Sequence, residues 1–167
     1  TNLFGINKYT DIEDYEFHAT HTNLKISISQ TADILDNFSI PHGSLPRVWD
    51  WRQHHAVTPP KDQMDCGSCW AFSTTGAIEG AWVVQGNHRL VSLSESQLVD
   101  CDSEGYNSGC NGGLPIDAMS YVQKKGLEKK ETYPYSPMQK QCKYNSSEAV
   151  VKITNSKEIA GENLLQH

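Results

Sequence analysis

The chain has 167 residues, with 14 lysines and arginines against 20 aspartates and glutamates, and a formal net charge of −6 at pH 7. Because it carries neither a basic cluster nor an arginine-rich stripe, nucleic acid is disfavoured as a partner. Its sequence contains no apolar run near the roughly 20 residues that a membrane-spanning helix needs, so a membrane is disfavoured as well.

Residues 1–44 are polar, contain no cysteine, and include the heptad Gly5-Ile6-Asn7-Lys8-Tyr9-Thr10-Asp11. This heptad resembles the G-x-N-x-[FY]-x-D element of the inhibitory prosegment in cathepsin L-like and cathepsin F-like zymogens. In those proteins the segment packs on the enzyme and passes through its cleft in reverse. The resemblance implies that residues 1–44 are the C-terminal part of such a prosegment. The longer helical element that normally precedes the heptad is absent, so self-inhibition is expected to be weak. The alternative is a polar leader in which the heptad occurs by chance.

A junction follows at Gly43-Ser44, where small residues before a proline indicate an exposed loop. The next run resembles a mature N-terminus of the same enzymes, and it reads Leu45-Pro46-Arg47-Val48-Trp49-Asp50-Trp51-Arg52. Cleavage to the mature form is therefore expected near Ser44 or Leu45. The alternation of Trp49 and Trp51 predicts a packing strand. Residues 53–65 are polar and contain prolines, which predicts a loop.

The run Asp62-Gln63-Met64-Asp65-Cys66-Gly67-Ser68-Cys69-Trp70-Ala71-Phe72 leads directly into a helical pattern. Apolar side chains recur at roughly helical spacing up to a stop at Gly86, and they are Trp70, Phe72, Ala77, Ile78, Ala81, Trp82 and Val84. Cys69 is therefore predicted to lie in the first turn of a helix, where free N–H groups stabilise an anion by about 0.3–1 kcal/mol. A cysteine attacks carbonyl carbon as the thiolate, so this position suits a nucleophile.

The segment C-G-S-C-W at residues 66–70 matches the signature around the nucleophile of papain and the cathepsins. On these residues the chain resembles the precursor of a papain-family cysteine protease of the cathepsin L-like or cathepsin F-like type. The resemblance implies a cysteine-type endopeptidase with Cys69 as nucleophile, and no metal or organic cofactor. It also implies three kinds of partner: peptide and protein substrates, the chain's own prosegment, and cystatin-type inhibitors. The helix alone stabilises the thiolate too little, so a paired histidine is required as well.

Gln63 lies six residues before Cys69. It resembles the family's glutamine, whose side-chain amide completes an oxyanion hole with the N–H of the nucleophile. Such a donor meets charge only as it develops in the tetrahedral intermediate, and its loss costs roughly 3–4 kcal/mol. The family usually has glycine immediately after this glutamine, whereas this chain has Met64. If that position needs a left-handed backbone, Met64 is expected to strain the loop or reshape the hole.

Two shorter helices are predicted further along the chain. Ser94 and Gln97 form a capping-box pattern that opens a helix ending at Cys101. The next helix is predicted over residues 115–125, with proline in its first turn and Gly126 as its stop. Its apolar positions are expected to face the core, and they are Ile116, Ala118, Met119 and Val122. The three helices together are expected to form the left, helical lobe of a papain-like fold.

Between these two helices lies the run Cys110-Asn111-Gly112-Gly113-Leu114-Pro115. Paired glycines let another backbone approach closely, and the family uses its matching pair to hydrogen-bond the substrate main chain. The alternative is a tight turn after a disulfide. The resemblance further implies that Leu114 and Pro115 line one wall of the second specificity subsite. The residues expected to contact substrate are Gly67, Ser68, Trp70, Gly112, Gly113, Leu114 and Pro115.

The five cysteines are Cys66, Cys69, Cys101, Cys110 and Cys142, so two disulfides would leave one thiol. The sequence alone allows three pairings of any four of them. The resemblance implies the pairs Cys66–Cys110 and Cys101–Cys142, with Cys69 free, and each bridge adds about 4 kcal/mol in the chain-entropy account. A zinc site at Cys66 and Cys69 is disfavoured because no second cysteine or histidine pair follows at a suitable spacing. A thioredoxin-like motif is disfavoured because no strand is predicted before it.

Disulfides imply an oxidising compartment, so a lysosomal or secreted location is expected. The sequons Asn37-Phe38-Ser39 and Asn145-Ser146-Ser147 fit glycosylation on that route. The run Tyr133-Pro134-Tyr135 also resembles the family and is expected to serve packing rather than chemistry. Residues 150–154 alternate and predict a strand that leads towards a second lobe.

The predicted fold class is therefore α+β. Residues 1–44 are expected to be prosegment, residues 45–155 the left lobe, and residues 156–167 the start of a β-rich right lobe that is largely missing.

The family's histidine and asparagine lie about 130–150 residues beyond the cysteine, whereas this sequence ends at His167. His88 lies in a polar turn and is expected to be solvated. His54 and His55 precede the cysteine motif in a polar stretch and are disfavoured as catalytic partners. The chain is therefore expected to be an inactive fragment of an endopeptidase precursor. The alternative is a natural truncation that binds peptides or prosegments without catalysis, and an inhibitor built from the prosegment is disfavoured.

Overall fold

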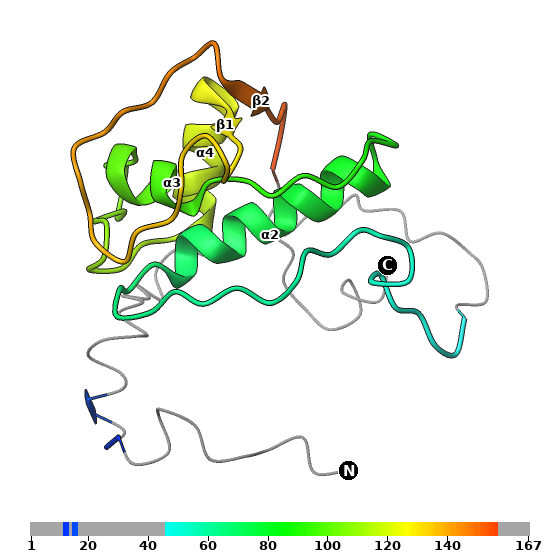
Figure 1. The fold of residues 1–167 in the computed structure, drawn as a ribbon, viewed down its shortest axis with the longest axis horizontal. Coiled ribbons are helices and arrows are strands. Elements are labelled where there is room, and N and C mark those ends of the chain that lie inside the picture. Colours follow the sequence, from blue (N-terminus) through cyan, green and yellow to red (C-terminus); the bar gives the residue numbers. More distant parts are fainter. Residues whose placement is uncertain (1–11, 14, 17–45, 157–167) are drawn as a thin grey trace, which may run out of the picture.

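The structure is a computed structural model, and it describes residues 12–13, 15–16 and 46–156. Its elements are α2 (Cys69–Val84), α3 (Glu95–Cys101), α4 (Pro115–Lys125), β1 (Leu127–Glu128) and β2 (Ala149–Val151). In Figure 1, α2 crosses the molecule, and α3, α4 and the strands gather on one side of it. Several predictions on the sequence lie outside the described residues, namely those for the heptad at 5–11, the sequon at Asn37, the junction at 43–45 and the segment 157–167.

The helix predicted from Cys69 is present as α2, and it ends at Val84, with Gln85 as its C-cap, just before Gly86. Its buried positions follow the three- and four-residue spacing of one helix face, and they are Trp70, Ala71, Thr74, Thr75, Ile78 and Glu79. Half of these positions carry polar side chains, whereas the apolar Ala77 and Val84 are exposed. The apolar pattern therefore located the helix but not its buried face.

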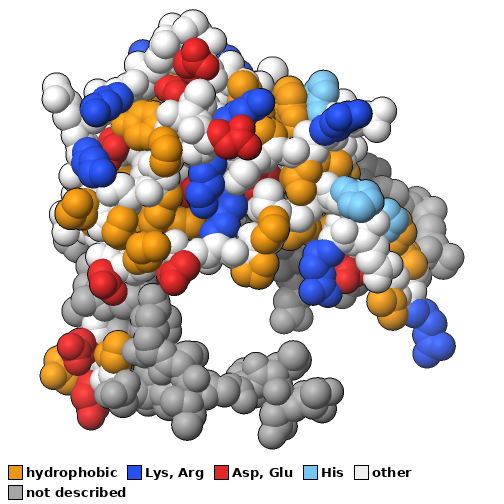
Figure 2. Space-filling view, viewed as in Figure 1, with side chains coloured by type: hydrophobic (Ala, Val, Ile, Leu, Met, Phe, Trp, Pro, Cys, Tyr) orange, Lys and Arg blue, Asp and Glu red, His pale blue; other side chains and the backbone are white. Residues whose placement is uncertain are grey.

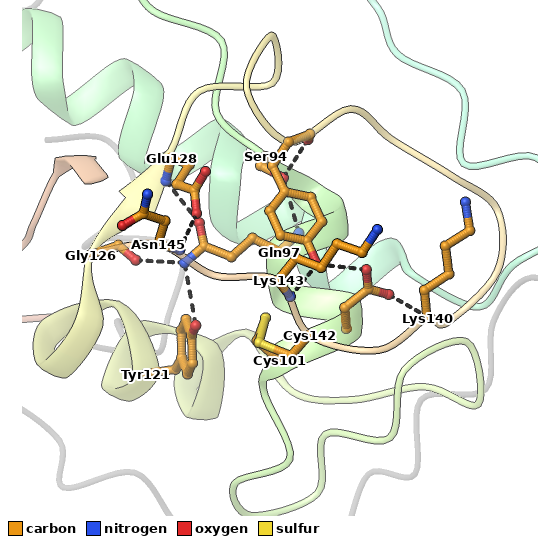
Figure 3. The surroundings of a disulfide bond; sticks show 12 residues. Ser94, Gln97, Cys101, Tyr121, Gly126, Glu128, Lys140, Cys142, Lys143 and Asn145 are labelled. Carbon is orange, nitrogen blue, oxygen red and sulfur yellow. Dashed lines mark hydrogen bonds between the residues drawn. A yellow bond between two sulfur atoms is a disulfide. The ribbon is translucent and has the colours of Figure 1, made fainter. Parts of the chain in front are cut away.

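Ser94 caps α3 as predicted, because its hydroxyl accepts a hydrogen bond from the N–H of Gln97 at 3.0 Å. The reciprocal half of the capping box was predicted wrongly, since the N–H of Ser94 donates to the carbonyl of Glu128 instead. In Figure 3 the Gln97 side chain points towards α4 and β1. Its Nε2 donates to the carbonyl of Gly126 at 2.9 Å, and its Oε1 accepts from the N–H of Glu128 at 2.8 Å. One buried amide therefore joins three elements of the core.

Helix α4 has the predicted bounds and ends at Lys125, because its C-cap, Gly126, has a φ of 83° that stops the helix. Ala118 and Val122 are fully buried, as predicted. Ile116 is 37% exposed, so its prediction as a core residue was wrong. Tyr121 is buried in the core, and its hydroxyl accepts a hydrogen bond from Gln97.

Strands β1 and β2 form an antiparallel pair. The strand predicted at residues 150–154 is therefore shorter and begins at Ala149. The packing strand predicted at Trp49 and Trp51 was wrong, since a turn begins at Trp51 and both rings are exposed. These rings pack with His54, which stacks on Trp49 at a centroid distance of 4.1 Å.

Two disulfides tie the loops to this framework, Cys66–Cys110 and Cys101–Cys142. They are the pairs that the resemblance implies, and Cys69 keeps a free thiol. Figure 3 shows the second bridge beside the Gln97 network. The bridge fixes the C-terminal end of α3, and the Ser94 cap holds its N-terminal end.

The surface is mixed in charge on the face shown in Figure 2, where acidic and basic side chains are interspersed among hydrophobic ones. This face carries no broad basic area among the residues that the structure describes. Within the same residues, none of the helices combines the length and the apolar character needed to cross a bilayer.

Candidate active site

Cys69 is the first residue of α2, and its thiol is free and half-buried. The N-cap, Ser68, makes no side-chain capping bond, and the first turn holds no acidic residue. In the part of the chain that the structure describes, the N–H of Cys69 has no hydrogen-bond acceptor. A nucleophile and an oxyanion donor both suit this position, where the positive end of the helix dipole meets an unused N–H.

Gln63 is tied to the loop that leads to Cys69. Its Nε2 donates to the carbonyl of Cys66 at 2.9 Å, and its own carbonyl accepts from the Tyr135 hydroxyl at 2.7 Å. Cys66 is itself held by its disulfide to Cys110. Gln63, whose side-chain amide is predicted to stabilise an oxyanion, is therefore held through both its side chain and its main chain.

Met64 adopts a left-handed backbone with φ of 53°. This is the condition under which strain is expected, because the conformation costs a residue with a side chain roughly 1–2 kcal/mol. The N–H of Met64 donates to Oδ1 of Asp62 at 2.8 Å, which holds the turn. The loop that contains Gln63 therefore stores strain at its next residue.

Replacing Met64 by glycine is expected to raise the free energy of unfolding by about 1 kcal/mol, because glycine adopts this backbone without a Cβ clash. Urea denaturation measures the change. Met138→Gly is the matched control, since Met138 is also exposed but is not among the residues with positive φ. The control is expected to destabilise the protein, and equal effects of the two substitutions would contradict strain at Met64.

The loop around Gly112 and Gly113 is joined to the Cys69 loop at Gly67. The N–H of Gly67 donates to the carbonyl of Cys110 at 2.9 Å, next to the Cys66–Cys110 disulfide. A Cβ on Gly67 would lie 2.4 Å from that carbonyl oxygen. The two loops predicted to flank a substrate can therefore meet only because residue 67 has no side chain.

Gly113 is packed closely against Trp70 and Asn107. A Cβ at this position would lie 2.3 Å from Oδ1 of Asn107 and 2.8 Å from the Trp70 ring. The ring nitrogen of Trp70 donates to the carbonyl of Gly109 at 3.1 Å. This glycine is therefore required by the packing beneath the loop.

The residues expected to contact substrate lie in two loops that meet beside Cys69, but they differ in exposure. Trp70 is 1% exposed and Ser68 is fully buried, so their side chains support the loops and do not reach a substrate in this structure. The substrate contact expected at Ser68 and Trp70 therefore stays a prediction, for their main chains. Leu114 and Pro115 are half-buried and remain accessible, whereas Gly67, Gly112 and Gly113 are buried.

Sequence reasoning missed Asn107 and Asp102, which hold the glycine loop in place. Oδ1 of Asn107 accepts from the N–H of Leu114 at 2.7 Å, and its Nδ2 donates to Oδ2 of Asp102 at 2.6 Å. Asp102 is buried, and this burial raises the pKa of its carboxyl. Both residues occur in a polar stretch after Cys101, where no local signal separates a buried amide from a solvated one.

The described histidines do not pair with Cys69. Among residues 46–156, no histidine is hydrogen-bonded to the Cys69 thiol. His54 stacks on Trp49, and His88 stacks on Trp82 at a centroid distance of 3.8 Å.

The pairing of Cys66 with Cys110 excludes two interpretations of the Cys66-x-x-Cys69 spacing. Cys66 is not available as a thiolate ligand for zinc, and it does not form a redox pair with Cys69. Among the described residues, no three histidine, cysteine, aspartate or glutamate side chains lie together in a way that could hold a metal ion.

A family model described as papain family cysteine protease matches residues 45–166. The chain belongs to the papain family of cysteine proteases. A cathepsin L-like proteinase of Fasciola hepatica is 40% identical over 157 residues, which cover 92% of this chain and 47% of that protein. The thiol protease aleurain of Arabidopsis thaliana is 39% identical over 166 residues, which cover 98% of this chain and 46% of that protein. The chain thus spans about half the length of the curated relatives it matches.

Solved structures of family members agree with this assignment. Procathepsin L 3 of the Tenebrio molitor larval midgut is 37% identical with a TM-score of 0.73, and the match covers 90% of this chain and 47% of that one. Procathepsin L2 from the same midgut is 31% identical with a TM-score of 0.78, and the match covers 96% and 54%. The papain-like fold and the resemblance to cathepsin L-like enzymes are therefore confirmed.

Proposed function

We propose that this protein is a cysteine endopeptidase that cleaves peptide bonds with Cys69 as its nucleophile. The observation that carries the proposal is the free, half-buried thiol at the N-terminus of α2. Beside it lies an N–H that has no acceptor among the described residues. Membership of the papain family supports the same chemistry.

In the proposed reaction, the Cys69 thiolate forms a bond to the carbonyl carbon, and the carbonyl electron pair moves onto oxygen. The Cys69 N–H and the Gln63 amide donate to this oxyanion. Collapse of the intermediate expels the amine, which takes a proton from a histidine, and leaves a thioester. Water that loses a proton to the same histidine then hydrolyses the thioester and releases the thiolate. That histidine lies outside residues 46–156, and the reaction uses neither a metal nor an organic cofactor.

The proposed substrate-binding surface lies on the glycine loop. The backbone of Gly112 and Gly113 hydrogen-bonds the substrate main chain, and Leu114 and Pro115 contact one substrate side chain. The half-buried positions of Leu114 and Pro115 support this assignment. The substrates are peptides and proteins.

The organisation proposed for the chain is that of a zymogen. Residues 1–44 act as the prosegment, residues 45–155 form the left lobe, and residues 156–167 begin the right lobe. The two disulfides support a lysosomal or secreted location, where cystatin-type inhibitors are further partners. Asn145 is a proposed glycosylation site, supported by its exposure and by a hydrogen bond of 2.8 Å from Oγ of Ser147 to its Oδ1.

A peptidyl epoxide that alkylates nucleophilic thiols tests the proposed function. After incubation with the complete polypeptide, mass spectrometry is expected to find one adduct, on Cys69, together with loss of hydrolysis of a fluorogenic peptide. Cys69→Ser is the control and is expected to take up no epoxide. Hydrolysis that survives in Cys69→Ser would contradict the proposal, as would a Cys69 that the reagent leaves unmodified.

A further inference from the structure

One tyrosine hydroxyl connects the two parts of the proposed oxyanion hole. The Tyr135 hydroxyl donates to the carbonyl of Gln63 at 2.7 Å and lies 2.8 Å from Oγ of Ser68. A carbonyl can only accept, so the single hydrogen of Tyr135 is committed to Gln63. The Ser68 hydroxyl has two acceptors within reach, the Tyr135 oxygen at 2.8 Å and the carbonyl of Cys66 at 3.4 Å, and the shorter contact makes Tyr135 the better acceptor. Ser68 immediately precedes Cys69, so this bridge of three residues spans from the Gln63 main chain to the start of α2.

The backbone on either side of Tyr135 is held on α3. The Ser94 hydroxyl donates to the carbonyl of Tyr133 at 2.7 Å. The N–H of Ser136 donates to Oγ of Ser96 at 2.8 Å. Both serines are buried. The bridging hydroxyl is therefore presented from a segment that is fixed on both sides.

The Tyr135 ring is fixed as well, because it packs edge-to-face on Phe72 in the first turn of α2, with ring centroids 4.9 Å apart. Burial raises the pKa of the Tyr135 hydroxyl above its ordinary value of 10.0. The hydroxyl therefore keeps its hydrogen at neutral pH and remains a donor to Gln63.

We propose that Tyr135 is a positioning residue that sets the geometry of the oxyanion hole. It does so by holding the Gln63 main chain and the residue before Cys69 to one oxygen atom. Between these two points lies Met64, whose left-handed backbone is strained, and a strained turn persists only where its surroundings hold it. This inference rests on the proposed function, because the separation of the two donors matters only in a reaction that forms an oxyanion.

Tyr135→Phe in the complete polypeptide tests the inference, since it removes one oxygen and keeps the ring on Phe72. We expect kcat to fall about 10-fold, with KM changed less than about 3-fold, because the donors meet charge only in the transition state. A peptide aldehyde forms an adduct with Cys69 in which a tetrahedral carbon carries the oxygen that occupies the oxyanion hole. Affinity for this aldehyde is expected to fall by a similar factor. Alkylation of Cys69 by iodoacetamide displaces iodide without forming an oxyanion, so its rate should not change.

Tyr133→Phe is the matched control, since that tyrosine lies in the same segment but donates to Asp100 at 2.8 Å. It is expected to keep both kcat and aldehyde affinity. The inference is overturned if Tyr135→Phe keeps them too, or if the alkylation rate falls in parallel with kcat, which would indicate general damage to the site.

A wild-type protein that neither hydrolyses peptides nor binds the aldehyde would refute the proposed function separately. In that case amide hydrogen exchange over residues 63–69 still decides the role of Tyr135. Exchange that is faster in Tyr135→Phe than in Tyr133→Phe would support the bridge. Equal exchange in the two variants would overturn it.

Discussion

Replacing Lys61 by methionine is expected to lower the free energy of unfolding by about 3–5 kcal/mol. Nζ of Lys61 lies 2.7 Å from Oε1 of Glu79 and 2.6 Å from Oε1 of Glu95, and these carboxylates are 1% and 0% exposed. Methionine occupies a similar volume without a charge, so two buried carboxylates lose the cation that they share. Chemical denaturation at pH 7 measures the loss.

The remaining hydrogen bonds of the two carboxylates come from neutral donors and cannot replace this cation. Glu79 accepts hydrogen bonds from the Thr58 hydroxyl and from the N–H of Leu93. Glu95 accepts one from the Thr75 hydroxyl, and among the described residues its Oε2 accepts none. Neutral donors offset part of the desolvation of a carboxylate but not its net charge.

Lys130→Met is the matched control. Nζ of Lys130 lies 3.8 Å from Oε2 of Glu95, and its side chain is 36% exposed. A pair at that distance, partly in water, is expected to contribute less than about 1 kcal/mol. If the two variants lost equal stability, the buried position of Lys61 would not be the cause.

The contribution of Lys61 also has a defined dependence on pH. Burial lowers the pKa of Lys61, but its hydrogen bonds with Glu79 and Glu95 outweigh that effect and raise the pKa above 10.5. A basic group whose pKa rises on folding contributes stability that is complete below its unfolded pKa and is lost as the pH rises through its folded pKa. The free energy of unfolding of the wild type is therefore expected to exceed that of Lys61→Met at neutral pH, and the difference should become smaller above pH 10.5.

This ion network marks the limit of what the sequence could predict about the fold. Glu79 and Glu95 resemble solvated helix residues in the sequence, and Lys61 lies in a polar loop. Only the packing of that loop against α2 and α3 buries the three groups together. The bounds of α4 were predictable because Pro115 and Gly126 mark its two ends by local backbone preferences.

In the candidate site, too, some residues could be predicted from the local sequence and others could not. Cys69 was predictable because its motif and the start of its helix are contiguous in sequence. Tyr135 was predicted to serve packing only, because its hydroxyl meets a carbonyl 72 residues earlier in the chain. Asn107 lies seven residues before the N–H that it fixes, in a stretch without helical or strand periodicity. Contacts of this kind become visible only when the loops are placed.

Replacing Gly67 by alanine in the complete polypeptide is expected to lower kcat/KM for a peptide substrate by about 100-fold and the free energy of unfolding by about 1–3 kcal/mol. The new Cβ would lie 2.4 Å from the carbonyl oxygen of Cys110, which also accepts the N–H of Gly67. That oxygen belongs to the backbone, and the disulfide to Cys66 keeps it from rotating aside. The clash must therefore be relieved by moving the glycine loop away from Cys69, which separates the two sides of the proposed substrate site.

Gly76→Ala is the control for this prediction, because Gly76 lies in α2 with no heavy atom within 4 Å of a Cβ built on it. Alanine in a helix interior is expected to add about 0.5–1 kcal/mol of stability there and to leave kcat/KM unchanged. Fluorogenic peptide hydrolysis and urea denaturation on both variants separate the possible outcomes. If Gly67→Ala loses stability but keeps kcat/KM, the close approach of the two loops serves folding alone, and their separation does not limit the reaction.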